Sequence, residues 1–301
     1  MLKKYSLFLV LLSGVFWGSS PLFVNHLNTL GYESLQTSAI RLILAAPMMH
    51  ICLLITGKEN YKIPLKSIKY LFLCGIGSVL TMCICYFYAM TLTSAAVSAV
   101  LLYTAPIFVM IMSIIFFNER FTARKCTALI FAVLGCALTS GIIGGISGSA
   151  LGVLIGLLSG FAYSLYGIIS TFAIKQGVTP IACTAFSFTF AAIAAFFITD
   201  PVKLISDIRL LSSSPIEIVM LPLFSLFTAV IPFILYTVGL KNVKPDVAAI
   251  AASTEPVVCV LFGTFILSQS ITVFQIIGII LVILAIIILN LKSNKKEVEP
   301  K

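Results

Sequence analysis

Long apolar segments recur along almost the whole chain, and they constrain its fold more than any other feature. Ten of them approach or reach membrane-spanning length, at residues 6–26, 34–56, 68–90, 94–117, 124–141, 150–172, 179–199, 217–239, 246–267 and 271–291. A helix needs roughly 20 mainly apolar residues to cross a bilayer. Only 10% of the 301 residues are charged, against about 25% in a soluble domain. The sequence therefore predicts an all-α integral membrane protein with ten transmembrane helices.

The positive charges predict the orientation of these helices. With the N-terminus in the cytoplasm, sixteen Lys and Arg residues fall on the inner side and three fall on the outer side, Arg41, Lys203 and Arg209. Cytoplasmic loops carry an excess of Lys and Arg. The first apolar segment has no A-x-A-like cleavage site, so we interpret it as a retained helix. We expect a multi-pass protein of the cytoplasmic (cell) membrane with both termini in the cytoplasm.

The sequence gives no signal for a metal, a cofactor or nucleic acid. All eight cysteines fall within or at the ends of the apolar segments, where Cys usually serves as a small buried residue. A phosphate-binding loop of the form GxxxxGK[ST] is missing from the sequence, which argues against ATP-driven transport by this chain alone. The net charge of +9 is explained by the Lys and Arg residues in the segments expected to be cytoplasmic, so it does not indicate nucleic-acid binding.

The chain contains an internal repeat. Residues 86–106, YFYAMTLTSAAVSAVLLYTAP, align without a gap on residues 236–256, YTVGLKNVKPDVAAIAASTEP, at a shift of 150 positions. The register places Tyr86 on Tyr236 and the final proline of one segment on that of the other. The long gap-free match indicates that the two halves of the chain are related.

Each half holds five predicted helices, so the second half would enter the membrane from the opposite side. We assign residues 1–145 to the first five-helix unit, 146–292 to the second and 293–301 to a charged cytoplasmic tail. Inverted repeats are common in secondary transporters, whose substrate sites lie at the midplane beside interrupted helices in corresponding positions. Pro106 and Pro256 fit that description, and we predict that they act as hinges.

Glu255 lies near the middle of an apolar segment, residues 247–267, that has no other charge. Insertion scales put a charged side chain at a helix centre at roughly +2.5 to +3.5 kcal/mol, and such residues usually face a protein interior or a watery cavity. Its repeat partner, Ala105, indicates that the fold does not need a carboxylate here. Pro256 frees the backbone carbonyl of Ala252 in the same region. We predict that Glu255 exchanges a proton or binds a substrate amine; the alternative is a permanently protonated, hydrogen-bonded Glu.

Five aromatic residues are candidates for the walls of a cavity. Trp17 is expected near mid-depth, with Tyr163 as its repeat partner, and Tyr103 reaches a similar depth from the other side. Their rings could stack on a flat substrate or hold a cation. Packing, with each polar tip bonded to a neighbour, is the open alternative. Tyr86 and Tyr236 lie toward opposite helix ends and are candidate gates.

The remaining charges near the membrane surfaces have simpler explanations. Arg41 lies one or two turns from the outer surface, where an Arg side chain usually extends to the lipid headgroups. Binding of a substrate carboxylate is the alternative role for Arg41. For Glu119, Arg120 and Arg124, at the inner ends of two consecutive helices, we expect local pairing and a role in topology.

Five short motifs occur in a specific order: FWGSSPLFVN (16–25), AIRLILAAP (39–47), TSAAVSAVLLYTAPIFV (93–109), NERFT (118–122) and GLKNVKPDVAAIAASTEPVV (239–258). On these motifs nearly the whole chain resembles the EamA-type transporters of the drug/metabolite transporter superfamily. The resemblance implies ten helices around a central cavity built from both repeats, and export or uptake of small metabolites. One departure is that Asn118-Glu119-Arg120 becomes Ser268-Gln269-Ser270 in the second half, so charge pairing at that helix end would be lost.

We therefore expect a secondary transporter that moves a small organic metabolite, such as an amino acid or amine, by alternating access. The expected partners are the substrate, the lipid bilayer and, as a candidate coupling ion, protons, with the chain acting as a monomer or homodimer. A passive channel is the first alternative. An intramembrane hydrolase that uses Ser147 is the weaker one, because neither His26 nor His50 is placed to act as its base. We expect no enzyme activity.

Overall fold

The computed structural model describes residues 2–30, 34–141, 149–199, 202, 206 and 215–290, and these residues form helices and short connections without a strand. Eight helical segments are long and apolar enough to cross a membrane: Tyr5–Leu27, Leu35–Thr56, Leu65–Leu92, Ala95–Phe117, Ala150–Lys175, Pro180–Ile198, Ile218–Leu240 and Pro245–Phe265. They coincide within a few residues with eight of the ten predicted spans. The other two, at 124–141 and 271–291, are the shorter helices α8 and α16.

Most of the long segments consist of more than one helix. The first half contains α1 (Leu2–Trp17), α2 (Ser20–Thr29), α3 (Ser34–Thr56), α4 (Ile68–Phe72), a π-helical segment (Leu73–Leu80), α5 (Thr81–Leu92), α6 (Ala95–Leu102), α7 (Ala105–Phe117) and α8 (Ala123–Thr139). The second half contains α9 (Ala150–Lys175), α10 (Pro180–Ile198), α12 (Pro215–Ser225), a π-helical segment (Leu226–Val230), α13 (Ile231–Leu240), α14 (Pro245–Ala252), α15 (Thr254–Phe265) and α16 (Val273–Asn290). The two π-helical segments lie in corresponding spans of the two halves.

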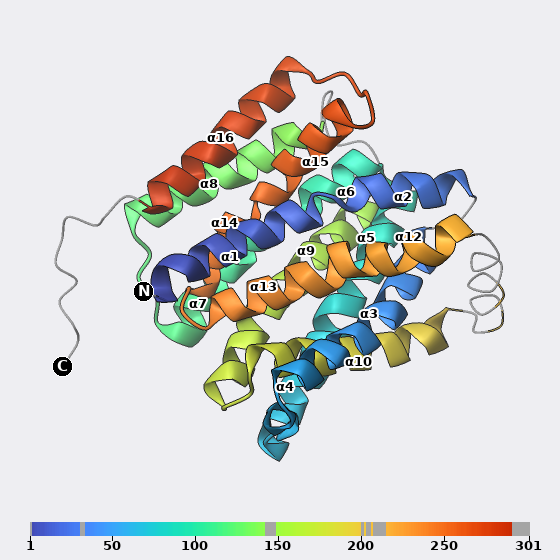
Figure 1. The fold of residues 1–301 in the computed structure, drawn as a ribbon. Helices are drawn as coiled ribbons and strands as arrows, with labels where there is room; N and C mark the ends of the chain where they lie inside the picture. The colour runs from blue at the N-terminus through green and yellow to red at the C-terminus, as the bar shows by residue number, and fades with distance from the viewer. Residues whose placement is uncertain are drawn as a thin grey trace.

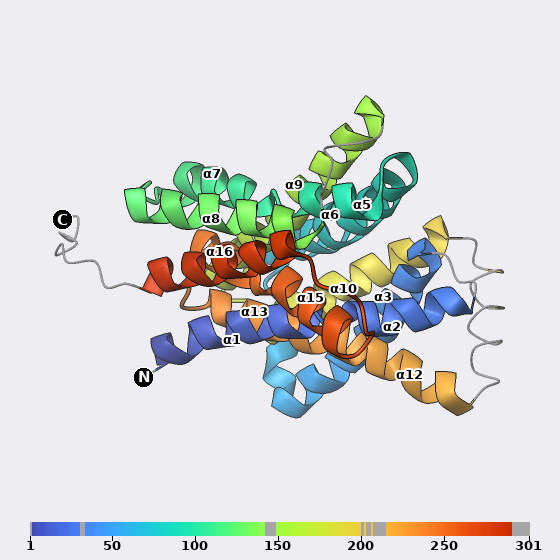
Figure 2. The same ribbon diagram turned by 90° about the horizontal axis from the view of Figure 1, so that it is seen from above.

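The helices of the two halves pack against each other along their lengths. The most extensive contacts pair α8 with α16, α3 with α10, α5 with α9 and α1 with α13, and each pair takes one helix from each half. In Figures 1 and 2, α1 begins and α16 ends on the same side of the molecule. We call this side the amino-terminal face. The opposite face carries the end of α2 and the beginnings of α3 and α12 (Figure 1).

Two spans in corresponding positions are broken in the middle. The first is interrupted between α6 and α7, and Pro106 lies in the first turn of α7. The second is interrupted between α14 and α15, and Pro256 lies in the first turn of α15. A proline is tolerated there because the first backbone N–H groups of a helix have no intrahelical acceptor. The sequence predicted a loosened helix at these prolines, and the structure interrupts the α-helix there by two residues in the first half and by one residue in the second.

Close helix packing surrounds both breaks. A Cβ atom at Gly14 of α1 would lie 1.9 Å from Oγ1 of Thr254, and one at Gly18 would lie 2.8 Å from the carbonyl oxygen of Glu255. In the other half, a Cβ atom at Gly160 of α9 would lie 2.6 Å from the carbonyl oxygen of Leu101. These glycines allow α1 and α9 to approach the backbone of the interrupted spans, which brings Trp17 and Tyr163 to mid-depth.

Candidate functional site

A cavity of about 330 Å³ lies between the two halves. Its lining comes from nine helices and one helix break, at Trp17, Ser20, Pro21, Val24, Thr37, Ser38, Arg41, Met82, Cys83, Tyr86, Phe87, Met90, Leu102, Tyr103, Tyr163, Phe224, Phe233, Glu255 and Cys259. Its lining residues on α3, Thr37, Ser38 and Arg41, lie near the beginning of that helix, which starts at the opposite face. The cavity therefore extends from mid-depth toward the opposite face.

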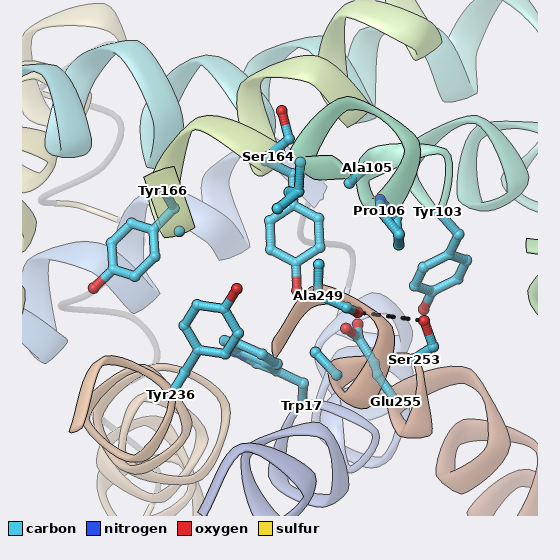
Figure 3. A pocket seen from close by; sticks show the side chains of 14 residues that line it. Trp17, Tyr103, Ala105, Pro106, Ser164, Tyr166, Tyr236, Ala249, Ser253 and Glu255 are labelled. Carbon is cyan, nitrogen blue, oxygen red and sulfur yellow. Dashed lines mark hydrogen bonds between the residues drawn. The ribbon is translucent and has the colours of Figure 1, made fainter. Parts of the chain in front are cut away.

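A second, much smaller cavity of about 30 Å³ adjoins the first on the side of the amino-terminal face. Both cavities are lined by Trp17, Tyr103, Tyr163 and Glu255. In Figure 3, the polar ends of Tyr103, Ser253 and Glu255 gather on one side of the smaller cavity. The four shared residues thus form the boundary between a wide space on one side and a narrow space on the other.

Glu255 is the second residue of α15, directly after the break. A carboxylate in the first turn of a helix is stabilised by the partial positive charge of that helix end. The side chain is only partly buried because it faces the cavities. Among the described residues, none of the ion pairs within 4.0 Å includes Glu255. In the described part of the chain, the carboxyl group therefore faces the cavities without a direct ion pair.

Arg41 of α3 lines the larger cavity together with Glu255. Its Nη2 donates a hydrogen bond to Sγ of Cys83 at 3.7 Å, and its Nε is buried without a hydrogen-bond partner. From the sequence, an extension to the lipid headgroups was the expected role of this side chain, and binding of a substrate carboxylate was the alternative. The position of Arg41 at the cavity favours binding of a substrate carboxylate over extension to the headgroups.

The predicted aromatic residues surround the same space from both halves. Trp17 contacts three rings, with centroid distances of 5.0 Å to Phe233, 5.6 Å to Tyr236 and 6.2 Å to Tyr163. Tyr86 lines only the larger cavity, whereas Tyr236 lines only the smaller one. The two candidate gates therefore lie on different sides of the Trp17 ring.

Comparisons with known proteins agree with this architecture. The model of the EamA-like transporter family matches residues 4–141 and 150–291, one match in each half. The chain belongs to the EamA-like transporter family. This EamA-like protein is a membrane transporter built from two repeats.

Curated relatives of this EamA-like transporter match it over most of their length. An uncharacterized transporter of Bacillus subtilis, YyaM, is 25% identical over 95% of this chain and 94% of its own. An uncharacterized transporter of Archaeoglobus fulgidus is 26% identical over 92% of this chain and 95% of its own. A solved crystal structure that is 16% identical superposes with a TM-score of 0.78, over 96% of this chain and 97% of the other, which supports the fold.

A cluster of charged residues joins the two repeats of the transporter at the amino-terminal face. Lys125 forms ion pairs with Asp246 and, at 3.3 Å, with Glu119. Lys244 pairs with the same Glu119 oxygen at 2.7 Å. From the sequence, only local pairing was expected for Glu119. This was incomplete, because Lys244 belongs to the other repeat, and Asp246 was not singled out at all.

Several residues that line the cavity were missed from the sequence although helical spacing could have found them. Cys259 lies four residues after Glu255 on α15, and Phe233 lies three residues before Tyr236 on α13. Residues three or four apart share a helix face. Phe224 lies before the π-helical segment of its span, where simple spacing from Phe233 fails.

Ser147, the nucleophile of the hydrolase alternative, lies outside the described residues. Of the two candidate bases, His50 is partly buried, with Nε2 2.8 Å from Oγ1 of Thr189 and Nδ1 3.2 Å from the hydroxyl of Tyr61. These contacts account for both nitrogens of its ring.

Proposed function

We propose that this EamA-like protein is a secondary transporter that moves a small organic metabolite across the cytoplasmic membrane by alternating access. One observation carries the proposal: a cavity lined by both repeats meets the break before α15 at mid-depth, where Glu255 stands without an ion-pair partner among the described residues. Substrate sites of this kind occur in many secondary transporters. A membrane protein with a purely structural role would not need an acidic group at this depth, where a charged side chain is costly.

The proposed topology has ten spans, with α8 and α16 as the fifth and tenth. Residues 1–145 and 146–292 then form inverted repeats, and 293–301 form a cytoplasmic tail. The pairing of α8 with α16, α3 with α10, α5 with α9 and α1 with α13 supports an axis that exchanges the repeats. The excess of Lys and Arg supports a cytoplasmic position of the amino-terminal face. The larger cavity then faces the outside, and one chain suffices to form it.

In the proposed cycle, the two repeats rock about the mid-depth site. Pro106 and Pro256 mark the flexible points at the two helix breaks. Tyr86 closes the outer passage in one state, and Tyr236 closes the inner passage in the other. The contact of Trp17 with Tyr236 supports the assignment of the present structure to the state that is closed on the inner side.

Glu255 is the proposed coupling group. It binds a proton or a substrate ammonium group when the site faces one side, and it releases that group on the other. Trp17, Tyr103 and Tyr163 surround the bound solute. Their position around the carboxyl group in both cavities supports this assignment.

Counterflow in proteoliposomes tests the function. A thermal-shift screen against small metabolites at two pH values selects a ligand, and liposomes are then loaded with that ligand in unlabelled form. A carrier accumulates the labelled ligand transiently above its outside concentration, whereas a passive channel, which dissipates gradients, does not. Absence of such trans-stimulation would reject the carrier mechanism. A Ser147→Ala variant with unchanged counterflow would exclude a role for the hydrolase alternative in transport.

A further inference from the structure

We propose that the amino-terminal face carries a binding site for the headgroup of an anionic phospholipid. Lys69 of α4 and Lys175 of α9 supply the positive charge, and a row of three aromatic rings holds their ammonium groups in place. The site is separate from the proposed transport path, since neither lysine lines one of the two cavities. In the topology proposed above, this site faces the inner leaflet.

The row of rings joins α4, α9 and α7. Tyr70 stacks on Phe172 with a centroid distance of 5.9 Å, and Phe172 lies 4.9 Å from Phe117. At one end of the row, Nζ of Lys69 lies 5.0 Å from the centre of the Tyr70 ring. At the other end, Nζ of Lys175 lies 4.3 Å from the centre of the Phe117 ring. An ammonium group within about 6 Å of a ring centre is attracted to the ring, so the row restricts two otherwise flexible side chains.

The positive charge at this site has no acidic partner among the described residues. Four lysines near the row are exposed: Lys62, Lys66, Lys69 and Lys175. None of them belongs to the ion pairs within 4.0 Å in the described ranges. The carboxyl group of Glu59 is turned toward Gly57, and Glu119, which follows α7, is already engaged in two ion pairs. The unbalanced charge is complementary to a phosphate group.

Large apolar side chains lie exposed beside these lysines. Leu65 is 85% exposed, and Ile68 and Phe72 of α4 are 41% and 47% exposed. Apolar groups next to Lys and aromatic residues are typical of the membrane–water interface, where the ammonium groups reach the headgroups. A phospholipid matches both parts of this surface, because its acidic headgroup meets the lysines and its acyl chains meet the apolar side chains. A free phosphate ion matches only the charged part.

The site includes helices from both halves of the chain. Lys69 belongs to the first half and Lys175 to the second, and α4 contacts α9 directly (Figure 1). Basic surfaces between membrane helices on the cytoplasmic side are typical of binding sites for anionic headgroups. A bound headgroup therefore strengthens the contact between α4 and α9, in addition to satisfying the two charges.

Native mass spectrometry of the full-length protein tests the proposal. The protein is purified in a neutral detergent and titrated with dioleoyl phosphatidylglycerol or dioleoyl phosphatidylcholine, which have the same acyl chains. The first phosphatidylglycerol should bind about fivefold or more tightly than the first phosphatidylcholine, because each Lys near an anionic headgroup contributes roughly that factor. Equal affinities would overturn the proposal. A large excess of inorganic phosphate should leave phosphatidylglycerol bound, and its displacement would assign the site to a soluble anion instead.

Variants locate the bound lipid. The pair Lys69→Gln and Lys175→Gln should bind the two lipids with similar affinity. The control pair Arg120→Gln and Lys241→Gln removes the same charge from exposed positions outside the row and should keep the preference. The pair Lys69→Arg and Lys175→Arg retains both charges and should also keep it. Phe117→Leu, which removes the ring beneath Lys175, should give an intermediate loss. An equal loss in the two glutamine pairs would mean that the lipid responds to net charge alone, which contradicts a site.

Thermal unfolding provides a second readout. A ligand that binds the folded state raises the unfolding temperature. Phosphatidylglycerol should therefore stabilise the wild type more than phosphatidylcholine does, and this difference should disappear in the pair Lys69→Gln and Lys175→Gln. A difference that persists in this pair would contradict the proposal. The binding assays need no transport, so a negative counterflow result would reject the carrier function and leave the lipid site standing.

Discussion

The two faces of the molecule have the same backbone geometry but different chemistry. Asn118 and Ser268, at the ends of α7 and α15, have positive φ angles of 51° and 55°. In both repeats the next residue donates its backbone N–H to a carbonyl six residues earlier, Glu119 to Ser113 and Gln269 to Gly263. The chain thus ends the two broken spans in the same way at opposite faces.

The charges in these matching turns differ. At the amino-terminal face, Glu119 and Lys125 take part in ion pairs that reach Asp246 in the other repeat. Gln269 and Gln275 hold the corresponding places at the opposite face, where Nε2 of Gln275 donates to the carbonyl oxygen of Thr139 at 3.4 Å. The larger cavity extends toward the neutral face, whereas the cavity of about 30 Å³ lies toward the charged one. In the alternating-access cycle proposed above, these few charged side chains favour the state that is closed at the amino-terminal face.

The largest loss of stability is expected from a variant at the buried centre of the charged cluster. The side chain of Asp246 is 0% exposed and that of Lys125 is 9% exposed. Removal of one member of a buried ion pair typically costs about 3–5 kcal/mol because the other charge stays buried. Asp246→Asn should therefore lower the thermal unfolding temperature clearly. The double variant Lys125→Met with Asp246→Leu should recover much of the loss, and a double variant as unstable as Asp246→Asn would contradict this account.

The second-largest loss of stability is expected from a variant that disturbs the close packing of α1 against the break between α14 and α15. In Gly14→Ala the new methyl group would lie 1.9 Å from Oγ1 of Thr254, so α1 must move away from the break between α14 and α15. Overpacking of this kind typically costs about 1–3 kcal/mol. Gly77→Ala is the matched control, because its methyl group would meet only Cδ2 of Leu73 at 3.8 Å. Equal unfolding temperatures for the two variants would show that the close approach is unimportant.

A third variant makes the two faces more alike. Gln269→Glu with Gln275→Lys introduces at the opposite face the Glu–Lys pair that joins α7 and α8. We expect a modest gain in closure of the opposite face, seen as slower labelling of the Cys259 thiol from that side. The effect should be small because the partners corresponding to Lys244 and Asp246 are absent there: Ser94 and Ala96 occupy those positions. Faster labelling would contradict the proposed role of the charges.

The smallest effect is expected at the solvent-exposed edge of the cluster. The side chain of Lys244 is 55% exposed. Exposed ion pairs contribute about 0.2–1 kcal/mol, and salt screens them. Lys244→Ala should lower the unfolding temperature slightly at low ionic strength and by less at high ionic strength. A loss as large as that of Asp246→Asn would mean that the exposed and buried pairs are equivalent.

The sequence predicted the apolar spans and the mid-depth position of Glu255 because each depends on local composition. Lone charges and matching prolines are visible without knowledge of the packing. The pair between Lys125 and Asp246 could not be predicted, since its members lie in different repeats and meet only where α8 packs against α14. The role of Arg41 was ambiguous for the same reason. At its depth, only the packing of α3 decides whether the guanidinium faces lipid or a cavity.

Labelling of Cys259 tests alternating access most directly. This thiol lines the larger cavity one turn from Glu255. A membrane-impermeant maleimide is applied to one side of oriented vesicles, and the peptide that contains Cys259 is quantified by mass spectrometry, with Cys259→Ser as the control for assignment. The account predicts labelling from the opposite face in the wild type, and increased labelling from the amino-terminal face in Asp246→Asn. A thiol that reacts from neither side, or equally from both sides in the wild type, would contradict a single cavity with alternating access.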